Sequence, residues 1–318
     1  MGRPPVDLHN GSMVVVFAIA AALVNAVTSF LQRLGVEDAP RTETGSRGVV
    51  AHAIRRPIWL LGFVCMLGGF VFQALALHGG SLAVVQPLLT TELLFVVIIL
   101  WAWFGIGVRP RDWLYAALTI VGLATFLAVV APTNSGHPPT NATWAVAIAA
   151  TAGAMVGLAA MSRSGPPWWR ALILGAAASV GFALTAALTK AFSDAFAIGI
   201  SDVVTSWQTY ALCVVGLSSF VLMQHAFHAG PFAASQSTLI LVNPFVSVGL
   251  GAWLYGESFP RGAGVVVAGV LAVVVFAAGA IGLCMSPLVA GVHASDTVQL
   301  LAGRGRLARH RAERGPTR

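Results

Sequence analysis

The chain has 318 residues, of which 57% are hydrophobic and 9% are charged, and its mean hydropathy is +0.83. Soluble domains carry about 25% charged residues, so this composition excludes a soluble globular protein and predicts an all-α membrane protein. The net charge of +7 does not indicate a nucleic-acid partner, because no basic folded domain or motif accompanies it. The arginines are expected to meet the lipid bilayer instead.

Nine apolar segments follow one another along the chain. Each is close to the roughly 20 residues that a helix needs to cross a bilayer, and turns rich in Gly and Pro separate them. We therefore predict nine transmembrane helices. Their expected ranges are 13–32, 57–78, 81–104, 112–130, 143–162, 170–193, 204–229, 231–254 and 261–284.

The arginines alternate between the predicted loops. They gather after spans one, three and five and in the tail, 285–318, whereas the other loops carry almost none. The positive-inside rule then places residues 1–12 outside and the tail in the cytoplasm. The Ala-, Arg- and Gly-rich composition suggests a bacterial chain, so we expect a multi-pass protein of the inner membrane.

The chain repeats itself at an offset of 150 residues, with 70–130 matching 220–280. Each span lies five spans from its copy, and because five is odd, the two copies cross the membrane in opposite directions. The sequence thus predicts an inverted-topology repeat with halves at 13–130 and 170–284, joined by the span at 143–162. Identical pairs include Phe70 and Phe220, His78 and His228, Gln86 and Gln236, Trp103 and Trp253, and Phe126 and Phe276.

Four short sequences resemble those of a known family. They are Thr28–Gly35 (TSFLQRLG), Trp59–Phe63 (WLLGF), Gly68–Phe70 (GGF) and the hairpin Ala76–Leu88 (ALHGGSLAVVQPL). Together with the two halves of four to five spans, they resemble the drug/metabolite transporter (DMT) superfamily, most closely its NIPA-type branch. The resemblance implies a DMT/EamA-like fold, and members of that branch are regarded as magnesium or cation transporters.

Glu92 is the carboxylate that lies well inside a predicted span, beside Thr91. A charge at mid-membrane costs on the order of 2.5–3.5 kcal/mol, so Glu92 is expected to face the bundle interior. It is our candidate for proton or cation coupling, and the candidate metal ligand if the cargo is Mg²⁺. The alternative is a protonated glutamate that bonds a neighbouring helix.

Gln86 and Gln236 occupy the same position in the two halves. They are expected to face each other or to line one cavity, unless they only bridge helices. Pro87 and Pro244 are expected to break their spans as hinges, and Asn243 precedes the second. Each proline frees a carbonyl that can bind a cation or a hydroxyl, or produces a simple kink.

Other polar residues have weaker assignments. His225 is a candidate proton carrier, Gln73 and Asn25 are candidate cavity liners, and Lys190 and Asp194 have the i,i+4 spacing of a helix-end ion pair. Gly153 and Gly157 have the spacing of a close-packing face that could support a homodimer.

No catalytic constellation, phosphate loop or metal-spaced His/Cys set is evident in the sequence. We therefore expect neither an enzyme nor a cofactor, but a secondary transporter that moves a small solute by alternating access. A NIPA-like carrier of Mg²⁺ or another cation, an EamA-type proton-coupled exporter of metabolites or drugs, and a membrane scaffold without transport remain open.

Overall fold

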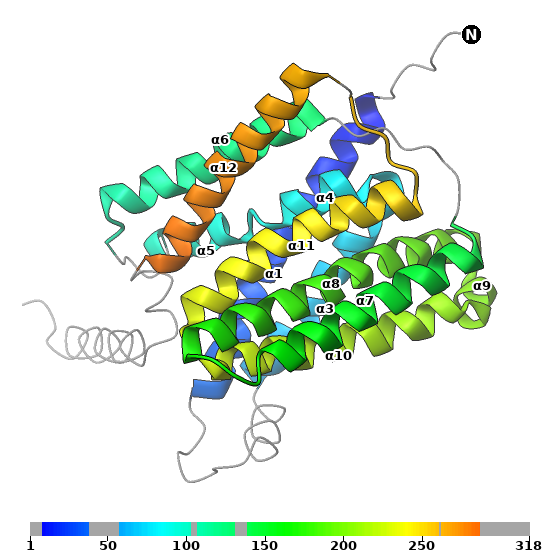
Figure 1. Cartoon of the computed structure of the whole chain (residues 1–318), viewed down its shortest axis with the longest axis horizontal. Coiled ribbons are helices and arrows are strands. Elements are labelled where there is room, and N and C mark those ends of the chain that lie inside the picture. Colours follow the sequence, from blue (N-terminus) through cyan, green and yellow to red (C-terminus); the bar gives the residue numbers. More distant parts are fainter. Residues whose placement is uncertain (1–7, 38–56, 103–106, 131–138, 261, 287–318) are drawn as a thin grey trace, which may run out of the picture.

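The computed structural model describes residues 8–37, 57–102, 107–130, 139–260 and 262–286. These residues form a bundle of long helices (Figure 1). The helices are α1 (Leu8–Glu37), α3 (Pro57–Gly79), α4 (Leu82–Leu89), α5 (Glu92–Ala102), α6 (Pro110–Val130), α7 (Asn141–Met161), α8 (Pro167–Ile198), α9 (Ile200–Thr205), α10 (Trp207–Ala229), α11 (Phe232–Leu254) and α12 (Ala263–Met285).

Nine stretches within the described residues are long and apolar enough to cross a membrane, which confirms the predicted number of spans. Eight of them correspond to single helices, and the ninth, Leu82–Ala102, combines α4 and α5. Most of the residues on which the predicted orientation depends, in 38–56 and 287–318, lie outside the described residues. The sidedness of the termini therefore stays a prediction.

The break in span three lies three residues beyond Pro87. The N–H groups of Thr90 and Thr91 bond the carbonyls of Pro87 and Leu88, so the helix tightens into a single 3₁₀-type turn. Their hydroxyls donate to the same two carbonyls, at 2.6 and 2.7 Å. These side chains compete with the α-helical bonding pattern and end α4.

A break at Pro244 is not found, and that prediction is wrong. α11 continues from Phe232 to Leu254 with the proline inside it. A single proline removes one backbone hydrogen bond, and membrane helices tolerate this loss when neighbouring groups compensate for it.

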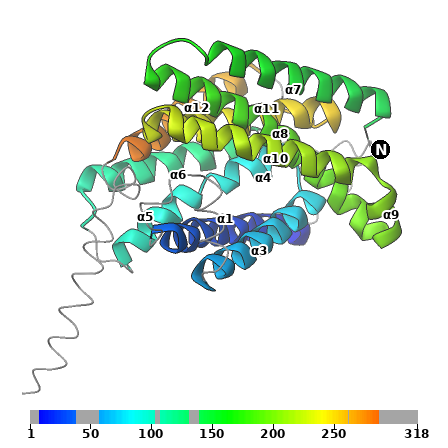
Figure 2. The same cartoon turned by 90° about the horizontal axis from the view of Figure 1, so that it is seen from below.

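The helices pack mainly in antiparallel pairs. α1 lies against α3, α8 against α10, and α6 against α12, while α8 and α4 both contact α11. In the view from below, the α1–α3 pair and α7 lie on opposite sides of the molecule, with α8 and α10 between them (Figure 2). The long helix α8 therefore runs through the middle of the bundle, and fifteen of its residues are buried.

Glycines allow close contact between α6 and α12. A Cβ at Gly122 would collide with the backbone of Phe276, and one at Gly279 would collide with the backbone of Thr119. Small residues at such positions let helix backbones approach closely, which is how helices associate in lipid.

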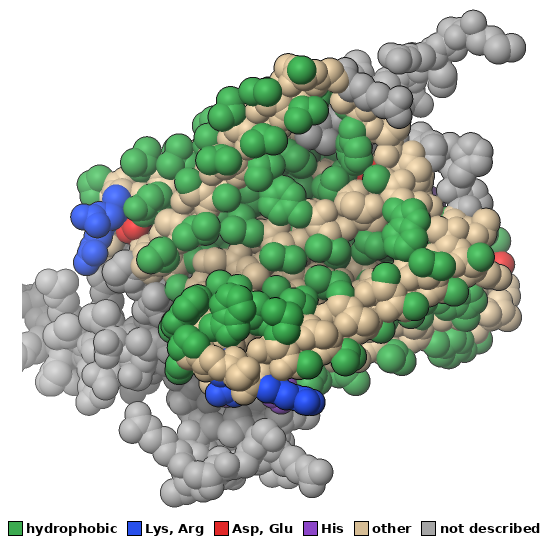
Figure 3. Space-filling model, viewed as in Figure 1, with side chains coloured by type: hydrophobic (Ala, Val, Ile, Leu, Met, Phe, Trp, Pro, Cys, Tyr) green, Lys and Arg blue, Asp and Glu red, His purple; other side chains and the backbone are tan. Residues whose placement is uncertain are grey.

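The outer face of the bundle is apolar. Large hydrophobic side chains are exposed along α3 and α12, including Val64, Val71, Val267 and Leu271. Figure 3 shows one such face, where hydrophobic side chains are spread over the whole surface and charged ones lie mostly at its margins. A water-soluble monomer rarely exposes so large an apolar surface, so this face is suited to contact with lipid.

Candidate functional site

A short polar strip joins α4 to α11 in the middle of the bundle. The Gln86 side chain, 2% exposed, accepts a hydrogen bond from Asn243 Nδ2 at 3.4 Å. Ser247, one turn further along α11, donates to Asn243 Oδ1 at 3.4 Å. Gln86, Asn243 and Ser247, which we call the polar strip, are neutral and can both donate and accept hydrogen bonds.

One donor of the polar strip is unused. Within the described part of the chain, Gln86 Nε2 is buried and has no hydrogen-bond partner. An unsatisfied buried donor costs about 1–3 kcal/mol, and most such groups have partners in native structures. The amide N–H is therefore an unused donor, which a bound molecule with an acceptor could reach if the contact between α4 and α11 opened.

An apolar pocket adjoins the polar strip. Pro87 and Pro244, the neighbours of Gln86 and Asn243, both line it, and its cavity volume is about 10 Å³, which is room for roughly one water molecule. The remaining lining residues come from α6, α11 and α12, and all are hydrophobic. They are Leu123, Phe126, Phe245, Val248, Val273 and Phe276.

Each of the two prolines leaves one backbone carbonyl without its helical hydrogen bond. Because a proline has no N–H, the carbonyls of Ala83 and Ile240 lack their usual helical donors. Both carbonyls lie one turn before a proline that lines the pocket. They add acceptors to a region whose side chains supply an unused donor.

Glu92 is the first residue of α5 and is half-buried. The positive end of a helix dipole stabilises a carboxylate at this place, and Glu92 has interactions of its own. The Thr91 hydroxyl donates to the Leu88 carbonyl at 2.7 Å, within the turn between α4 and α5. Both residues thus belong to the break that follows Gln86 and Pro87.

Gln236 does not meet its repeat counterpart. Gln86 bonds Asn243, which lies seven residues further along α11, or about 10 Å along the helix axis. Gln236 is half-buried, as is Gln73 on α3. Gln86 thus bonds Asn243 and not its repeat counterpart, and the expectation that the two glutamines line one cavity stays a prediction.

His225 and Asn25 lie away from the polar strip. His225 is exposed on α10, and its Nδ1 pairs with the Val221 carbonyl of the same helix at 2.8 Å. A proton carrier inside the bundle would have to point inward, so that assignment is not supported. Asn25 lies against Gly69, where α1 packs on α3.

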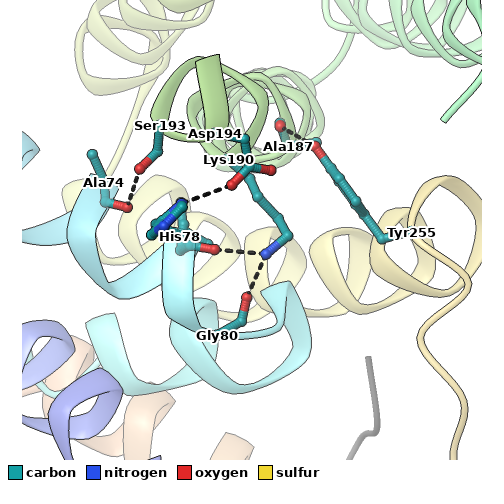
Figure 4. A network of polar contacts seen from close by, with 9 residues as sticks. Ala74, His78, Gly80, Ala187, Lys190, Ser193, Asp194 and Tyr255 are labelled. Atoms are coloured by element: carbon teal, nitrogen blue, oxygen red, sulfur yellow. Dashed lines mark hydrogen bonds and ion pairs between the residues drawn. The ribbon is translucent and has the colours of Figure 1, made fainter. Parts of the chain in front are cut away.

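A second polar cluster holds the turn between α3 and α4. Lys190 of α8 is 7% exposed, and its Nζ donates to the carbonyls of Leu77 and Gly80 at 2.6 and 2.7 Å (Figure 4). Its Nζ also lies 5.5 Å from the centroid of the Tyr255 ring, within the range of a cation–π contact. The charge is thus buried but solvated by protein dipoles.

Residues around Lys190 link α8 to α3 and to the end of α11. Ser193 donates to the Ala74 carbonyl at 2.9 Å, and the Tyr255 hydroxyl donates to the Ala187 carbonyl at 2.7 Å. Asp194 pairs with His78 at 2.8 Å on the exposed side of the cluster. Lys190 therefore turns inward to the α3–α4 turn, and Asp194 takes a partner on α3, in place of the helix-end pair predicted from their spacing.

Glu257, in the loop between α11 and α12, reaches the same turn. Its side chain is 3% exposed, and its two oxygens accept hydrogen bonds from the N–H groups of Leu82 and Ala83, at 2.7 and 3.1 Å. It therefore caps α4, since the side chain of Ser81 at the N-cap position makes no such bond. Burial raises the pKa of Glu257 above its ordinary value of 4.5, against the opposing effects of the two N–H bonds and of Lys190.

The sequence pattern gave no sign of the role of Glu257, and it predicted a different partner for Lys190. Glu257 lies outside every apolar span, where an acidic residue is ordinary. Lys190 did carry a signal, because it is the single lysine beside 17 arginines and it falls within an apolar stretch. Ionisable residues in such positions are rare and are usually functional.

Metal-ligating side chains do not gather in the described part of the chain, where no group of three or more His, Cys, Asp or Glu is arranged to hold a metal ion. No protein-family model matches the chain, and no solved structure matches it. The chain is 26% identical over 254 residues to an uncharacterised protein of Corynebacterium glutamicum, in an alignment that covers 79% of this chain and 88% of that protein.

Proposed function

We propose that the protein is a secondary transporter of the drug/metabolite transporter kind, which carries a small solute across the membrane by alternating access. The observation that carries this proposal is the polar strip with its unused Gln86 donor beside an apolar pocket, at the contact between α4 and α11. A transporter with an inverted repeat has its substrate site near mid-membrane, where its halves meet.

The pocket itself supports a repeated architecture. Leu123 and Val273 both line it, and so do Phe126 and Phe276. The members of each pair are 150 residues apart, which is the offset of the sequence repeat. A pocket on the axis that relates two halves would be lined by such matched pairs.

The helix contacts agree with that pattern. α4 packs on α11 and α6 on α12, and in the sequence repeat these helices belong to corresponding spans. The α1–α3 pair corresponds in the same way to the α8–α10 pair. Two related halves packed around one site would provide the two-state element that alternating access requires.

The chemistry of the site favours a small amphipathic organic solute. Its side chains are neutral amides, a hydroxyl and apolar groups, so a ligand with one hydrogen-bond acceptor and an apolar portion would satisfy both parts. Mg²⁺ binds oxygen ligands, usually with one or two carboxylates and retained waters. Glu92 is the carboxylate that a cation cargo would use.

Uptake into proteoliposomes tests the proposal. We expect saturable movement of at least one member of a panel of amphipathic amines, amino acids and neutral metabolites, and weaker transport by Asn243→Ala. Uptake of Mg²⁺ alone would instead support the NIPA-like function. Absence of solute or proton movement across the whole panel, with the protein folded, would refute a transporter and leave a membrane scaffold.

A further inference from the structure

The hydrogen bonds of the Lys190 cluster cross between the two halves of the molecule. We call α1 to α6 the first half and α8 to α12 the second half. Lys190 and Ser193 belong to the second half and bond carbonyls of the first. Glu257 also belongs to the second half and accepts from N–H groups of the first.

These bonds hold both sides of a single turn. Lys190 neutralises the carbonyl end of α3 at Leu77 and Gly80, and Glu257 caps the amide end of α4 at Leu82 and Ala83. Each helix end thus receives the charge that its dipole favours, a cation at the carboxyl end and an anion at the amino end. Separation of the halves would leave four backbone groups without these partners.

The cluster lies at one end of the polar strip. Ser247 precedes the end of α11 by seven residues, or about 10 Å along the helix, and Gln86 follows the start of α4 by four residues. The hydrogen bonds that Lys190 and Glu257 make to the α3–α4 turn therefore lie between the polar strip and that end of the molecule. This end is extracytoplasmic if the arginine rule holds.

From this geometry we infer that Lys190 and Glu257 form a lock that closes the α3–α4 end of the molecule and must release before the polar strip opens to that side. The inference rests on the proposed transport function, to which it adds a gate. His78, Asp194 and the Tyr255 ring surround the lock, and the exposed His78–Asp194 pair adds little, because surface ion pairs contribute little.

The closed state of the lock is not strongly favoured over the open state, because it buries two charged side chains. Burial of two charged side chains is costly, and water that enters an opened gate restores their hydration. Removal of either side chain leaves the two backbone groups that it bonds buried without these hydrogen bonds, which weakens the closed state. Lys190→Met and Glu257→Ala should therefore both shift the protein toward the open state.

Cysteine labelling measures that shift without knowledge of the substrate. Ser247→Cys is introduced after Cys65, Cys213 and Cys284 are replaced, and the full chain is treated in intact cells and in inside-out vesicles with a membrane-impermeant maleimide. Ser201→Cys, exposed on α9 near the lock, identifies the side on which this end lies. From that side, we expect Lys190→Met and Glu257→Ala to raise the rate of labelling at position 247 about tenfold. The labelling rate follows the fraction of molecules in the open state, which we expect to rise by the same factor.

A matched control uses the same helix. Arg170→Met removes a cation from an exposed position at the opposite end of α8 and should leave the labelling rate within about twofold of wild type. A disulfide between Ala74→Cys and Ser193→Cys, at the site of their present hydrogen bond, should return labelling of the Lys190→Met protein to the wild-type rate, and a reductant should reverse this.

Labelling at the wild-type rate in folded Lys190→Met and Glu257→Ala would overturn the lock. If Lys190→Met does not fold, Glu257→Ala decides alone, because the substituted residue lies in a loop outside every helix of the described chain. Raised labelling together with an absence of uptake for every solute would support the lock and refute the transporter. Uptake of a solute with an unchanged labelling rate would support the transporter and refute the lock.

Discussion

Asn243 of α11 donates a hydrogen bond to Gln86 of α4 at 3.4 Å, and the other end of the Gln86 amide is buried without a partner in the described part of the chain. The contact joins the two halves at one point and leaves one donor free there. A structural bridge between helices would use both ends of the amide. The half-used amide is therefore the feature that makes this helix contact a candidate binding site.

Gln86→Leu should lower transport about tenfold while the protein stays folded. Leucine has nearly the same volume, removes the unsatisfied donor and cannot bond the solute, and a lost hydrogen bond of about 1.4 kcal/mol is a factor of ten. Initial uptake rates and thermal unfolding in detergent measure the two effects. Gln236→Leu is the matched control, since it makes the same change away from the strip. Equal losses in both variants would remove Gln86 from the site.

Glu92→Gln should abolish the pH dependence of transport if Glu92 is the coupling residue. A proton that binds and leaves during the cycle needs an ionisable group, and glutamine keeps the shape without that group. The ratio of uptake rates in acidic and alkaline buffer should fall to about 1. A Glu92→Gln protein that transports with the wild-type pH profile would show that another group carries the proton.

The number of spans was predictable from sequence because it depends on composition averaged over about 20 residues. The break in span three was also visible, because Pro87 and two threonines act on the backbone nearby. The continuity of α11 across Pro244 was not, because compensation for a lost backbone bond comes from packing that no local pattern records.

The polar strip was predictable only in part. Gln86 and Asn243 stood out as amides in apolar spans, but their partnership depends on the register between α4 and α11. The repeat suggested Gln236 instead, because an offset in sequence gives equivalence and not contact. Glu257 escaped notice for a related reason, since its partners lie 174 and 175 residues away in the chain.

Gly122→Leu should destabilise the protein by about 1–3 kcal/mol or prevent its assembly, because the added side chain would collide with the Phe276 backbone. Gly157→Leu is the control, since a Cβ there meets nothing within 4 Å. That variant should change stability by no more than about 0.5 kcal/mol. Unfolding in detergent micelles compares the two, and similar values would contradict the close contact of α6 with α12.

The stability of the protein should fall as pH rises above about 4.5, through the raised pKa of Glu257. Burial raises this pKa, so the folded protein binds the proton more tightly than the unfolded chain does. The contribution is fully present below 4.5 and is lost as the group ionises. Melting temperatures of wild type and Glu257→Gln across this range test the effect. The difference between the two should grow with pH, and parallel curves would contradict it.

The burial of Lys190 gives the protein an unusual chemical property. The chain has one lysine, so a reagent that acylates amines can modify only that side chain and the amino terminus. In the closed arrangement its ammonium is held by two carbonyls and shielded by an aromatic ring. The rate of acylation of Lys190 would therefore report, in the unsubstituted protein, how often its hydrogen bonds to the α3–α4 turn break.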